Sequence, residues 1–399
     1  MYVLFGKETD DLVVLLGVES SDNSSIPRFN IESITLVEEL GTLSPVVNVK
    51  FFDQVGHSLY YQPIMPDFTF ILTMGRRNEE TFQTRLKMTN VAYESNDPSE
   101  IKNVMVSIDF VSEHWEKLYK IQKSRSFQNK KISDVITQLS REVGFSSTDI
   151  ETTNLSDTII QPYWNNAKFI KWLSQQATTE QRRNGFTFYV DRNDKFSFKT
   201  FAGMYGGTDD IIDIPHNSVA NAEAELSFNL PKIVNHYMPV LNNAGFGMQH
   251  CAFDYTNKRF IYEVISPDVY KSVPLSTHHM LANEHISSET INYNGRNINP
   301  APSRNLMVNS TNNVQTMDII VRGRKDLELG DVINLIMPVS GENDTQDTFN
   351  HIYGGKWLIS KMIHQMNVAN HDYSIICRLS RNGINLPPAY DDGVLLKAR

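Results

Sequence analysis

The chain has 399 residues and a net charge of −9, with 40% hydrophobic and 21% charged residues. This length exceeds what one hydrophobic core usually organises, so we expect two to four domains. Acidic and basic residues are mixed along the chain, which argues against a free-standing nucleic-acid binder whose affinity comes from clustered Lys and Arg. DNA that passes through an acidic channel without adhering is compatible with this charge.

The chain carries no recognisable targeting or membrane segment. Charged side chains between Lys7 and Asp11 lie where a signal peptide needs its apolar core. The longest apolar runs, 12–18 and 68–74, are the size of strands and too short to span a bilayer. We therefore expect a soluble chain made in the cytoplasm, or one that leaves by a route needing no signal. The two cysteines, Cys251 and Cys377, have no metal-ligand spacing and are predicted to be reduced thiols.

The region from 29 to 113 is typical of consecutive β-strands. Val106, Ile108 and Phe110 alternate with polar residues, which is the period of a half-buried strand. The segments rich in β-branched and aromatic residues are 29–37, 46–52, 68–74, 81–93 and 101–111. This pattern predicts an antiparallel barrel or sandwich of about five strands.

Two amphipathic helices are predicted next. Residues 130–144 place Ile132, Val135, Ile136, Leu139 and Val143 at helical spacing, and Gly144 suits the position after the helix. In 165–177, Asn166 is predicted to cap a second helix, with its apolar face formed by Phe169, Ile170, Leu173 and Ala177.

Residues 186–201 carry a strong hairpin signal. Phe186, Phe188 and Val190 are predicted to alternate inward, Asn193-Asp194 to make the turn, and Phe196 and Phe198 to return. Two helices backed by this hairpin would form one α+β unit.

The remainder returns to strands, with a polar interruption. Strands are predicted at 224–228 and 232–240, and again in a terminal meander at 316–323, 331–339, 351–363 and 373–381. Residues 241–312 are polar and irregular, apart from a predicted hairpin at 253–264. An acidic loop at 340–350 is expected on the surface, and the tail from 386 is expected to be extended.

The terminal hairpin, residues 354–382, raises the question of catalysis because it holds His364, His371, Asp372 and Cys377. His371 and Asp372 fall in the turn, whereas Cys377 lies along a strand that rises about 3.3 Å per residue, roughly 15 Å away. That separation exceeds the reach of a Cys–His pair. We therefore predict a structural hairpin, packed by one row of side chains: Trp357, Ile359, Ile363, Tyr373, Ile375 and Cys377.

Other candidate sites are weak. The segment 277–288 contains His278, His279, Glu284 and His285, but His279 and His285 are six residues apart and point to different sides of a helix. Residues 202–210 contain glycines without the Lys-Ser/Thr pair of a phosphate-binding loop, and 181–185 is an isolated basic stretch. No catalytic, cofactor-binding or metal-binding residue is predicted, and no cofactor is expected.

Four stretches carry a resemblance to a known family, in this order along the chain: 46–60 (VVNVKFFDQVGHSLY), 112–140 (SEHWEKLYKIQKSRSFQNKKISDVITQLS), 159–177 (IIQPYWNNAKFIKWLSQQA) and 327–338 (LELGDVINLIMP) with 355–384 (GKWLISKMIHQMNVANHDYSIICRLSRNGI). Their order and spacing resemble the baseplate hub proteins of contractile-tailed phages, in particular T-even hubs. The last stretch is also similar to hubs of Mu-like tails and to type VI secretion spikes. Nothing after the meander resembles the needle of those spikes, and no segment resembles a lysozyme.

The resemblance implies a mainly β fold with two tube-like antiparallel β-barrel domains and two inserted domains, assembled as a trimeric torus. The implied domains are 1–115 (first barrel), 116–205 (α+β insert), 206–240 (start of the second barrel), 241–312 (second insert), 313–385 (rest of the second barrel) and 386–399 (extended tail). Such a homotrimer would join the hexameric tail tube protein to the central spike protein in the virion, near tape measure and baseplate wedge proteins. DNA would pass through its lumen without specific binding.

Two other readings stay open. A tail-associated hydrolase of peptidoglycan or polysaccharide could be built on a β scaffold, with carboxylates that only the fold brings together. The same fold could also serve as a distal-tail or hub protein of a non-contractile tail.

Overall fold

The computed structural model describes residues 2–8, 12–18, 30–53, 68–76, 81–94, 104–154, 156–179, 185–206, 211–216, 227–235, 248–254, 257–265, 288–292, 301–337, 353–368 and 370–382. No helix within these ranges is long and apolar enough to cross a membrane. The predictions made for 277–287, 340–350 and 386–399 concern segments outside the described residues.

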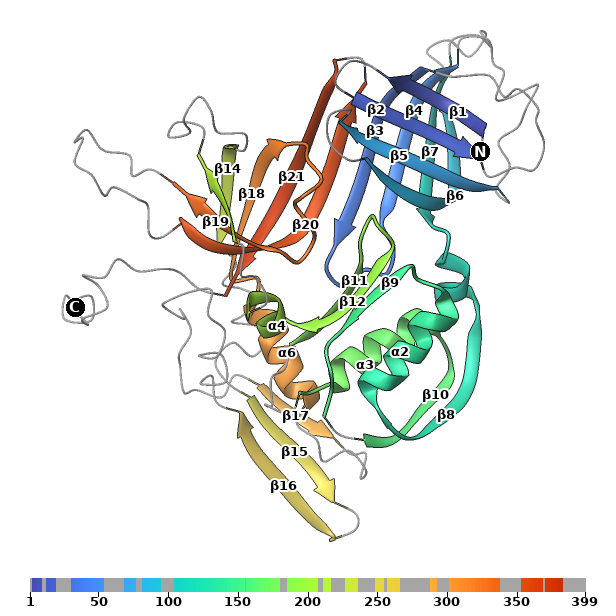
Figure 1. The fold of residues 1–399 in the computed structure, drawn as a ribbon. Coiled ribbons are helices and arrows are strands. Elements are labelled where there is room, and N and C mark those ends of the chain that lie inside the picture. The colour runs from blue at the N-terminus through green and yellow to red at the C-terminus, as the bar shows by residue number, and fades with distance from the viewer. Residues whose placement is uncertain are drawn as a thin grey trace, which may run out of the picture.

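One 13-stranded sheet organises the molecule (Figure 1). Its first half contains β1 (Tyr2–Glu8), β2 (Leu12–Val18), β3 (Asn30–Glu39), β4 (Val46–Asp53), β5 (Thr69–Arg76), β6 (Phe82–Glu94) and β7 (Val104–Ser112). They pair in the order β1-β2-β5-β6-β7-β4-β3, all antiparallel, and β1 returns to contact β3. The five predicted strands are confirmed, and two N-terminal strands add to them.

The second half of the sheet is built mainly from the end of the chain. Its strands are β13 (Ile212–Pro215), β14 (Phe228–Asn235), β18 (Gln315–Arg322), β19 (Val332–Ile336), β20 (Gly355–Asn367) and β21 (Asp372–Arg381). The order is β20-β21-β18-β14, with β19 pairing both β20 and β13. The four predicted terminal strands are confirmed, but they do not form a simple meander, because β18 pairs with β21 and not with β19.

The two halves meet where β3 pairs with β20. This antiparallel contact runs from Lys361 opposite Glu39 to Asn367 opposite Ser33, so backbone hydrogen bonds continue from one half into the other. A single hydrophobic core then extends across both halves, including Phe70, Phe110 and Trp357. The halves therefore form one continuous body.

A β-bulge in β20 corrects one prediction. An extra residue in β20 shifts the register with β21 between Ile359 and Lys361. The side chains that follow the bulge therefore point to the opposite faces from those that an unbroken alternation predicts. As a result Met362 and His364 are buried, whereas Ile363 is only half-buried. Ile363 does not belong to the packing row, and the other five predicted members of that row do.

The first insert leaves the sheet after β7. Its elements are η1 (Glu116–Lys120), β8 (Gln122–Lys131), α2 (Ile132–Val143), β9 (Ser147–Ile150), β10 (Ser156–Asn165), α3 (Asn166–Gln176), β11 (Phe186–Val190), β12 (Lys195–Thr200) and α4 (Phe201–Gly206). The predicted helices and hairpin are confirmed, and Gly144 ends α2 with φ of 95°. The β8–β10 ribbon and β9 were not predicted.

The cap of α3 differs from the prediction by one residue. Asn165, not Asn166, accepts the hydrogen bond of the Lys168 amide, at 2.8 Å. Asn166 already has helical backbone, and its side-chain amide donates instead to the Lys117 carbonyl at 3.0 Å. Asparagine is a favoured N-cap residue, so the sequence allows either Asn165 or Asn166 to cap the helix. The contact of Asn166 with the Lys117 carbonyl leaves the cap to Asn165.

The β11–β12 hairpin is buried on both faces, which the predicted alternation does not anticipate. Phe186, Phe188 and Val190 pack in the insert core as expected. Tyr189, on the opposite face, packs in the core of the large sheet. The hairpin is therefore wedged between two cores, which explains why all five residues of β11 are buried.

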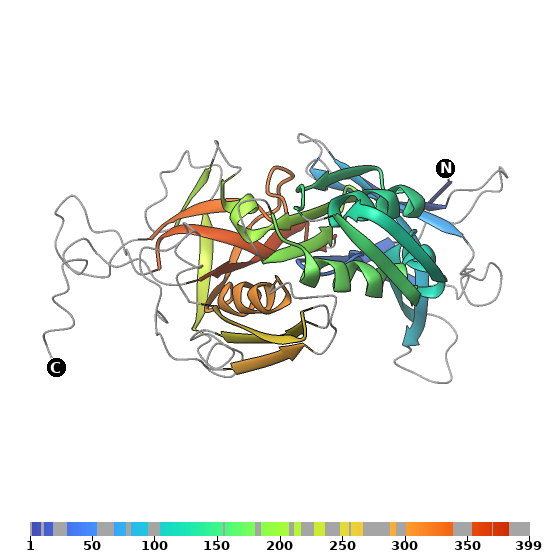
Figure 2. The same cartoon turned by 90° about the horizontal axis from the view of Figure 1, so that it is seen from below.

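The second insert is more regular than predicted. It contains β15 (Met248–Asp254), β16 (Arg259–Ile265) and β17 (Ser288–Asn292), ordered β16-β15-β17, and the helix α6 (Ala301–Thr311). The predicted hairpin is confirmed, whereas the helix was missed because its apolar periodicity is weak. α6 lies between this sheet and the body of the molecule (Figures 1 and 2).

Asn305 fastens α6 to the first insert. Its side-chain oxygen accepts the Gly185 amide at 2.6 Å, and its side-chain nitrogen donates to the Gln175 and Ala177 carbonyls, each at 2.8 Å. Gly185 has φ of 82°, and a Cβ there would lie 2.3 Å from Val308. Only glycine fits this contact between helix and hairpin.

Candidate functional site: a buried junction and a polar groove

A chain of hydrogen bonds crosses the interior where β3, β20 and β21 lie side by side. The Tyr373 hydroxyl lies 2.9 Å from Nδ1 of His364, and Nε2 of His364 lies 2.9 Å from Oε2 of Glu38. This pattern fits a neutral imidazole that accepts from the tyrosine and donates to the carboxylate. The arrangement has the form of a hydroxyl–imidazole–carboxylate relay.

Arg192, in the turn of the β11–β12 hairpin, brings the first insert into the same cluster. Its Nη1 lies 3.3 Å from Oε2 of Glu38, and its backbone amide donates to the other carboxylate oxygen. Its Nη2 donates to the carbonyls of Lys325 and Leu327, at 2.5 and 3.0 Å. The Thr84 hydroxyl of β6 donates to the backbone carbonyl of Arg192. We call Glu38, Arg192, His364 and Tyr373 the junction cluster.

Contacts within the junction cluster determine which of its side chains are ionised. Burial by itself would raise the pKa of Glu38, but the His364 hydrogen bond and the Arg192 charge outweigh it and lower that pKa. Burial lowers the pKa of His364, which keeps the imidazole neutral. The cluster is therefore one paired carboxylate and guanidinium with a neutral histidine beside them.

The relay has no access to a substrate. Glu38 and His364 are 0% exposed, and Tyr373 is 2% exposed. Cys377, on the same strand as Tyr373, is also buried, and burial raises the pKa of its thiol to about 12. A nucleophile needs both approach and a lowered pKa, so this arrangement serves packing instead of catalysis.

The terminal hairpin separates its polar residues as predicted. His371 and Asp372 lie exposed at the turn, where His371 has φ of 54°. Cys377 faces the core between Ile319 and Met362, its neighbours on adjacent strands. The local sequence around His364 offers no orienting group for its imidazole. The structure supplies Glu38 from a strand more than 300 residues away, which no local pattern reveals.

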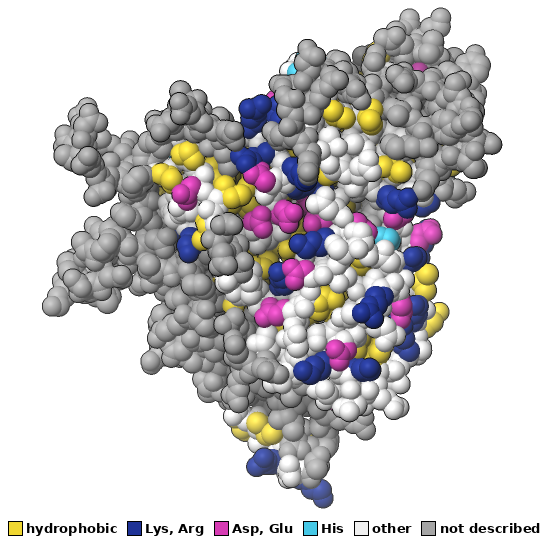
Figure 3. Space-filling model, in the orientation of Figure 1, with side chains coloured by type: hydrophobic (Ala, Val, Ile, Leu, Met, Phe, Trp, Pro, Cys, Tyr) yellow, Lys and Arg dark blue, Asp and Glu magenta, His cyan; other side chains and the backbone are white. Residues whose placement is uncertain are grey.

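Other predicted candidates are only partly tested. The histidine segment containing His278, His279, Glu284 and His285 is outside the described residues. Over the described ranges, no group of three or more His, Cys, Asp or Glu side chains is placed to hold a metal ion. Among the described residues on the face drawn in Figure 3, basic and acidic side chains are interspersed.

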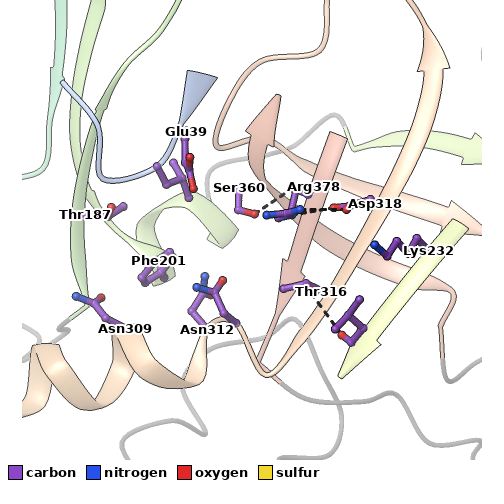
Figure 4. A pocket seen from close by; sticks show the side chains of 13 residues that line it. Glu39, Thr187, Phe201, Lys232, Asn309, Asn312, Thr316, Asp318, Ser360 and Arg378 are labelled. Carbon is purple, nitrogen blue, oxygen red and sulfur yellow. Dashed lines mark hydrogen bonds and ion pairs between the residues drawn. The ribbon is translucent and has the colours of Figure 1, made fainter. Parts of the chain in front are cut away.

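A polar groove lies on the outer face of the second half of the sheet. It has a volume of about 660 Å³ and is bounded by β14, β18, β20 and β21 on one side and by α6, α4 and β11 on the other (Figure 4). Asn309 of α6 and Asn312, which follows the end of α6, lie opposite Lys232, Asp318 and Arg378 of the strands. The groove is lined mainly by polar and charged side chains.

The mainly β architecture, with two barrel-like halves joined in one sheet and with two insertions, is shared with solved structures of tail proteins. No model of a known protein family matches the chain, and no curated protein matches it. Solved structures do. The 43 kDa tail protein of prophage MuSo2 from Shewanella oneidensis matches with a TM-score of 0.58 and 9% identity, over 93% of this chain and 98% of that protein.

Two further structures have the same fold. A tail protein from Neisseria meningitidis MC58 matches with a TM-score of 0.56 and 8% identity, over 94% of this chain and 97% of that one. A chain of the lidless PdpA-VgrG complex matches with a TM-score of 0.50 and 12% identity, over 96% of this chain and 67% of that one. The predicted resemblance to tail hub proteins is thereby confirmed at the level of the fold.

Proposed function

We propose that this chain is the baseplate hub of a phage tail: a homotrimeric ring that adapts the hexameric tail tube to the trimeric central spike. The observation that carries the proposal is the continuous sheet of two barrel-like halves, which matches two tail proteins over nearly their whole lengths. Three copies would present six such halves, the number that a hexameric tube requires.

The junction cluster supports the role of a rigid adaptor. β3 and β20 join the halves through backbone hydrogen bonds. Arg192 connects the first insert to the first half through Glu38 and to the second half through the Lys325 carbonyl. An adaptor between two symmetries has to keep its halves at a fixed angle. A buried ionic contact at that point favours one arrangement over its alternatives.

We also propose that the hub carries no catalysis and lets DNA pass through its lumen. The relay-like cluster is closed to solvent, which disfavours the hydrolase alternative. The net charge of −9 favours a channel that repels the phosphate backbone. A hub of a non-contractile tail would share these properties. Identifying the tube protein that binds the chain would distinguish the two types of tail.

Sedimentation and electron microscopy of the purified chain, alone and with its tube and spike proteins, test the proposal. The expected result is a three-fold ring that binds both partners. A chain that stays monomeric with both partners present contradicts it. Turnover of peptidoglycan that disappears in Cys377→Ala or His364→Gln, with folding retained, would favour the hydrolase instead.

A further inference from the structure

The outer strand of the second insert carries exposed aromatic rings. β16 is the terminal strand of the sheet β16-β15-β17, and no described strand pairs with its outer edge (Figure 1). Phe260 and Tyr262 share one face of β16 and are 57% and 60% exposed. The Phe260 ring lies 4.9 Å from that of Phe253 on β15 and 6.1 Å from that of Tyr262, between ring centroids. α6 packs on this sheet from one side (Figure 2), so the exposed row of rings belongs to the other side.

The outer edge of β16 lacks the usual protection of an edge strand. Natural edges are blunted by proline, by a bulge or by a covering element, because an open row of backbone N–H and C=O groups is a template for another strand. β16 reads RFIYEVI, without proline, and keeps its register with β15 from Arg259 to Ile265 without a bulge. Exposed aromatic side chains beside an open edge are typical of an interface. β16 is therefore suited to accept a further strand.

The sequence of β16 is complementary to itself. When two copies of a strand pair antiparallel about a two-fold axis, one residue lies opposite its own copy, and the residues equally far on either side of it pair with each other. With the axis at Ile261, Arg259 of each copy lies opposite Glu263 of the other. Phe260 of each copy likewise lies opposite Tyr262 of the other. Opposite charges and aromatic pairs are among the cross-strand contacts that stabilise a sheet, and the symmetry makes each of them twice.

Moving the axis along the strand removes this match. With the axis at Tyr262, Arg259 would lie opposite Ile265 and Glu263 opposite Ile261, so that each charge faces an aliphatic side chain. With the axis at Glu263, that carboxylate would lie opposite its own copy, and like charges directly opposite are destabilising. Of the registers that pair at least five residues of β16, only the one centred on Ile261 sets opposite charges against each other.

We propose that β16 joins two copies of the chain, with the outer edges of the two strands paired antiparallel about Ile261. The two three-stranded sheets become one continuous sheet, and each open edge covers the other. The contact is separate from the proposed ring, because the second insert lies outside the sheet that unites the two halves and because a two-fold contact does not generate a three-fold ring. Pairing hides an edge that otherwise is a template for aggregation.

Disulfide trapping of the full chain tests the register directly. In a Cys251→Ser background, which leaves only the buried Cys377, Ile261→Cys should form a linked dimer under mild oxidation, because the two Cα atoms would lie about 5 Å apart. Tyr262→Cys is the matched control, since its two copies would be diagonal neighbours about 8 Å apart, beyond the reach of a disulfide. If Ile261→Cys links no more than Tyr262→Cys does, the inference is wrong.

Charge exchange across the contact is a second test that needs no new cysteine. In sedimentation equilibrium, Arg259→Glu should weaken dimerisation about tenfold or more, because it sets two carboxylates opposite each other at both ends of the paired segment. Arg259→Glu combined with Glu263→Arg should restore the native dissociation constant to within about threefold. Lys130→Glu, on the exposed surface of β8, is the matched control and should change nothing.

The outcomes for the two-fold contact and for the ring are distinguishable. Equal dimerisation of the native chain and of folded Arg259→Glu, or no recovery in the double variant, overturns the inference. A three-fold ring whose Ile261→Cys variant does not link overturns the two-fold contact but leaves the proposed hub intact. Linked dimers of a chain that never forms a ring contradict the hub alone.

Discussion

Replacing Arg192 with leucine should destabilise the folded chain strongly. The substitution leaves the carboxylate of Glu38, which is 0% exposed, without its cation. Breaking one side of a buried ion pair typically costs about 3–5 kcal/mol. The carbonyls of Lys325 and Leu327 also lose a donor, at about 1 kcal/mol or more each, although such losses are not additive. We expect a loss of at least about 3 kcal/mol in the free energy of unfolding.

Urea unfolding followed by tryptophan fluorescence measures this loss, and a fall of about 4–6 °C in Tm should accompany it. The pH dependence identifies the cause. Without Arg192 the pKa of Glu38 rises. The difference in the free energy of unfolding between the variant and the native chain should therefore be largest near pH 7, and it should shrink toward pH 4 as Glu38 takes up a proton. Glu38→Gln combined with Arg192→Leu should recover at least about 1 kcal/mol by removing the orphaned charge.

Arg85→Leu is the matched control. Arg85 pairs with Glu113 at 3.8 Å, but its side chain is 50% exposed, so its loss should cost less than about 1 kcal/mol. If Arg192→Leu unfolds at the same urea concentration as the native chain, or if the deficit does not change with pH, then the junction cluster does not hold the two halves and the insert together.

Three further substitutions have defined outcomes. Burial raises the pKa of Asp191 to about 6, above its ordinary value of 3.8. The ionised carboxylate therefore costs stability above pH 6, and Asp191→Asn, which can still accept the Asn193 amide, should gain about 2–3 kcal/mol in urea unfolding at pH 8 and nothing at pH 3. Gly323→Ala should lower Tm by several degrees, because its Cβ would lie 2.2 Å from the Tyr373 ring, and unchanged melting would mean that the ring moves freely. Asn165→Ala should cost about 1–2 kcal/mol in the same assay, because the α3 cap and the hydrogen bond from the Asn165 side-chain nitrogen to the Tyr119 carbonyl are both lost, and Asn165→Asp should also destabilise the chain because it keeps the cap but cannot donate to that carbonyl.

The sequence predicts the elements well where hydrophobic period and turn chemistry act locally. The alternation in β7, the left-handed Gly144 after α2 and the β20–β21 hairpin all follow from neighbours within a few residues. The bulge in β20 does not follow from the local sequence, because no glycine or proline marks the position of the extra residue. Ile363 was therefore assigned to the wrong face.

The junction cluster could not be predicted because its members come from distant segments. Glu38 reads as an ordinary polar residue before a turn, and Arg192 as part of a hairpin loop. Only the pairing of β3 with β20 and the wedging of the β11–β12 hairpin bring them within hydrogen-bond distance. His364 carried a weak local signal, since it is a titratable residue between two methionines that proved to be buried.

The pairing of β3 with β20 also constrains how the chain reaches its native state. Glu39 and Lys361 are 322 residues apart, so β3 has to wait for nearly the whole chain to be made. At about 5–20 residues per second, ribosomal synthesis leaves that strand edge uncovered for roughly 15–65 s. An uncovered edge is a template for pairing with other chains, so the first half depends on its end-of-chain partner to escape aggregation. Folding of this protein is therefore slow by topology, and a chain shortened before β20 should accumulate as insoluble material.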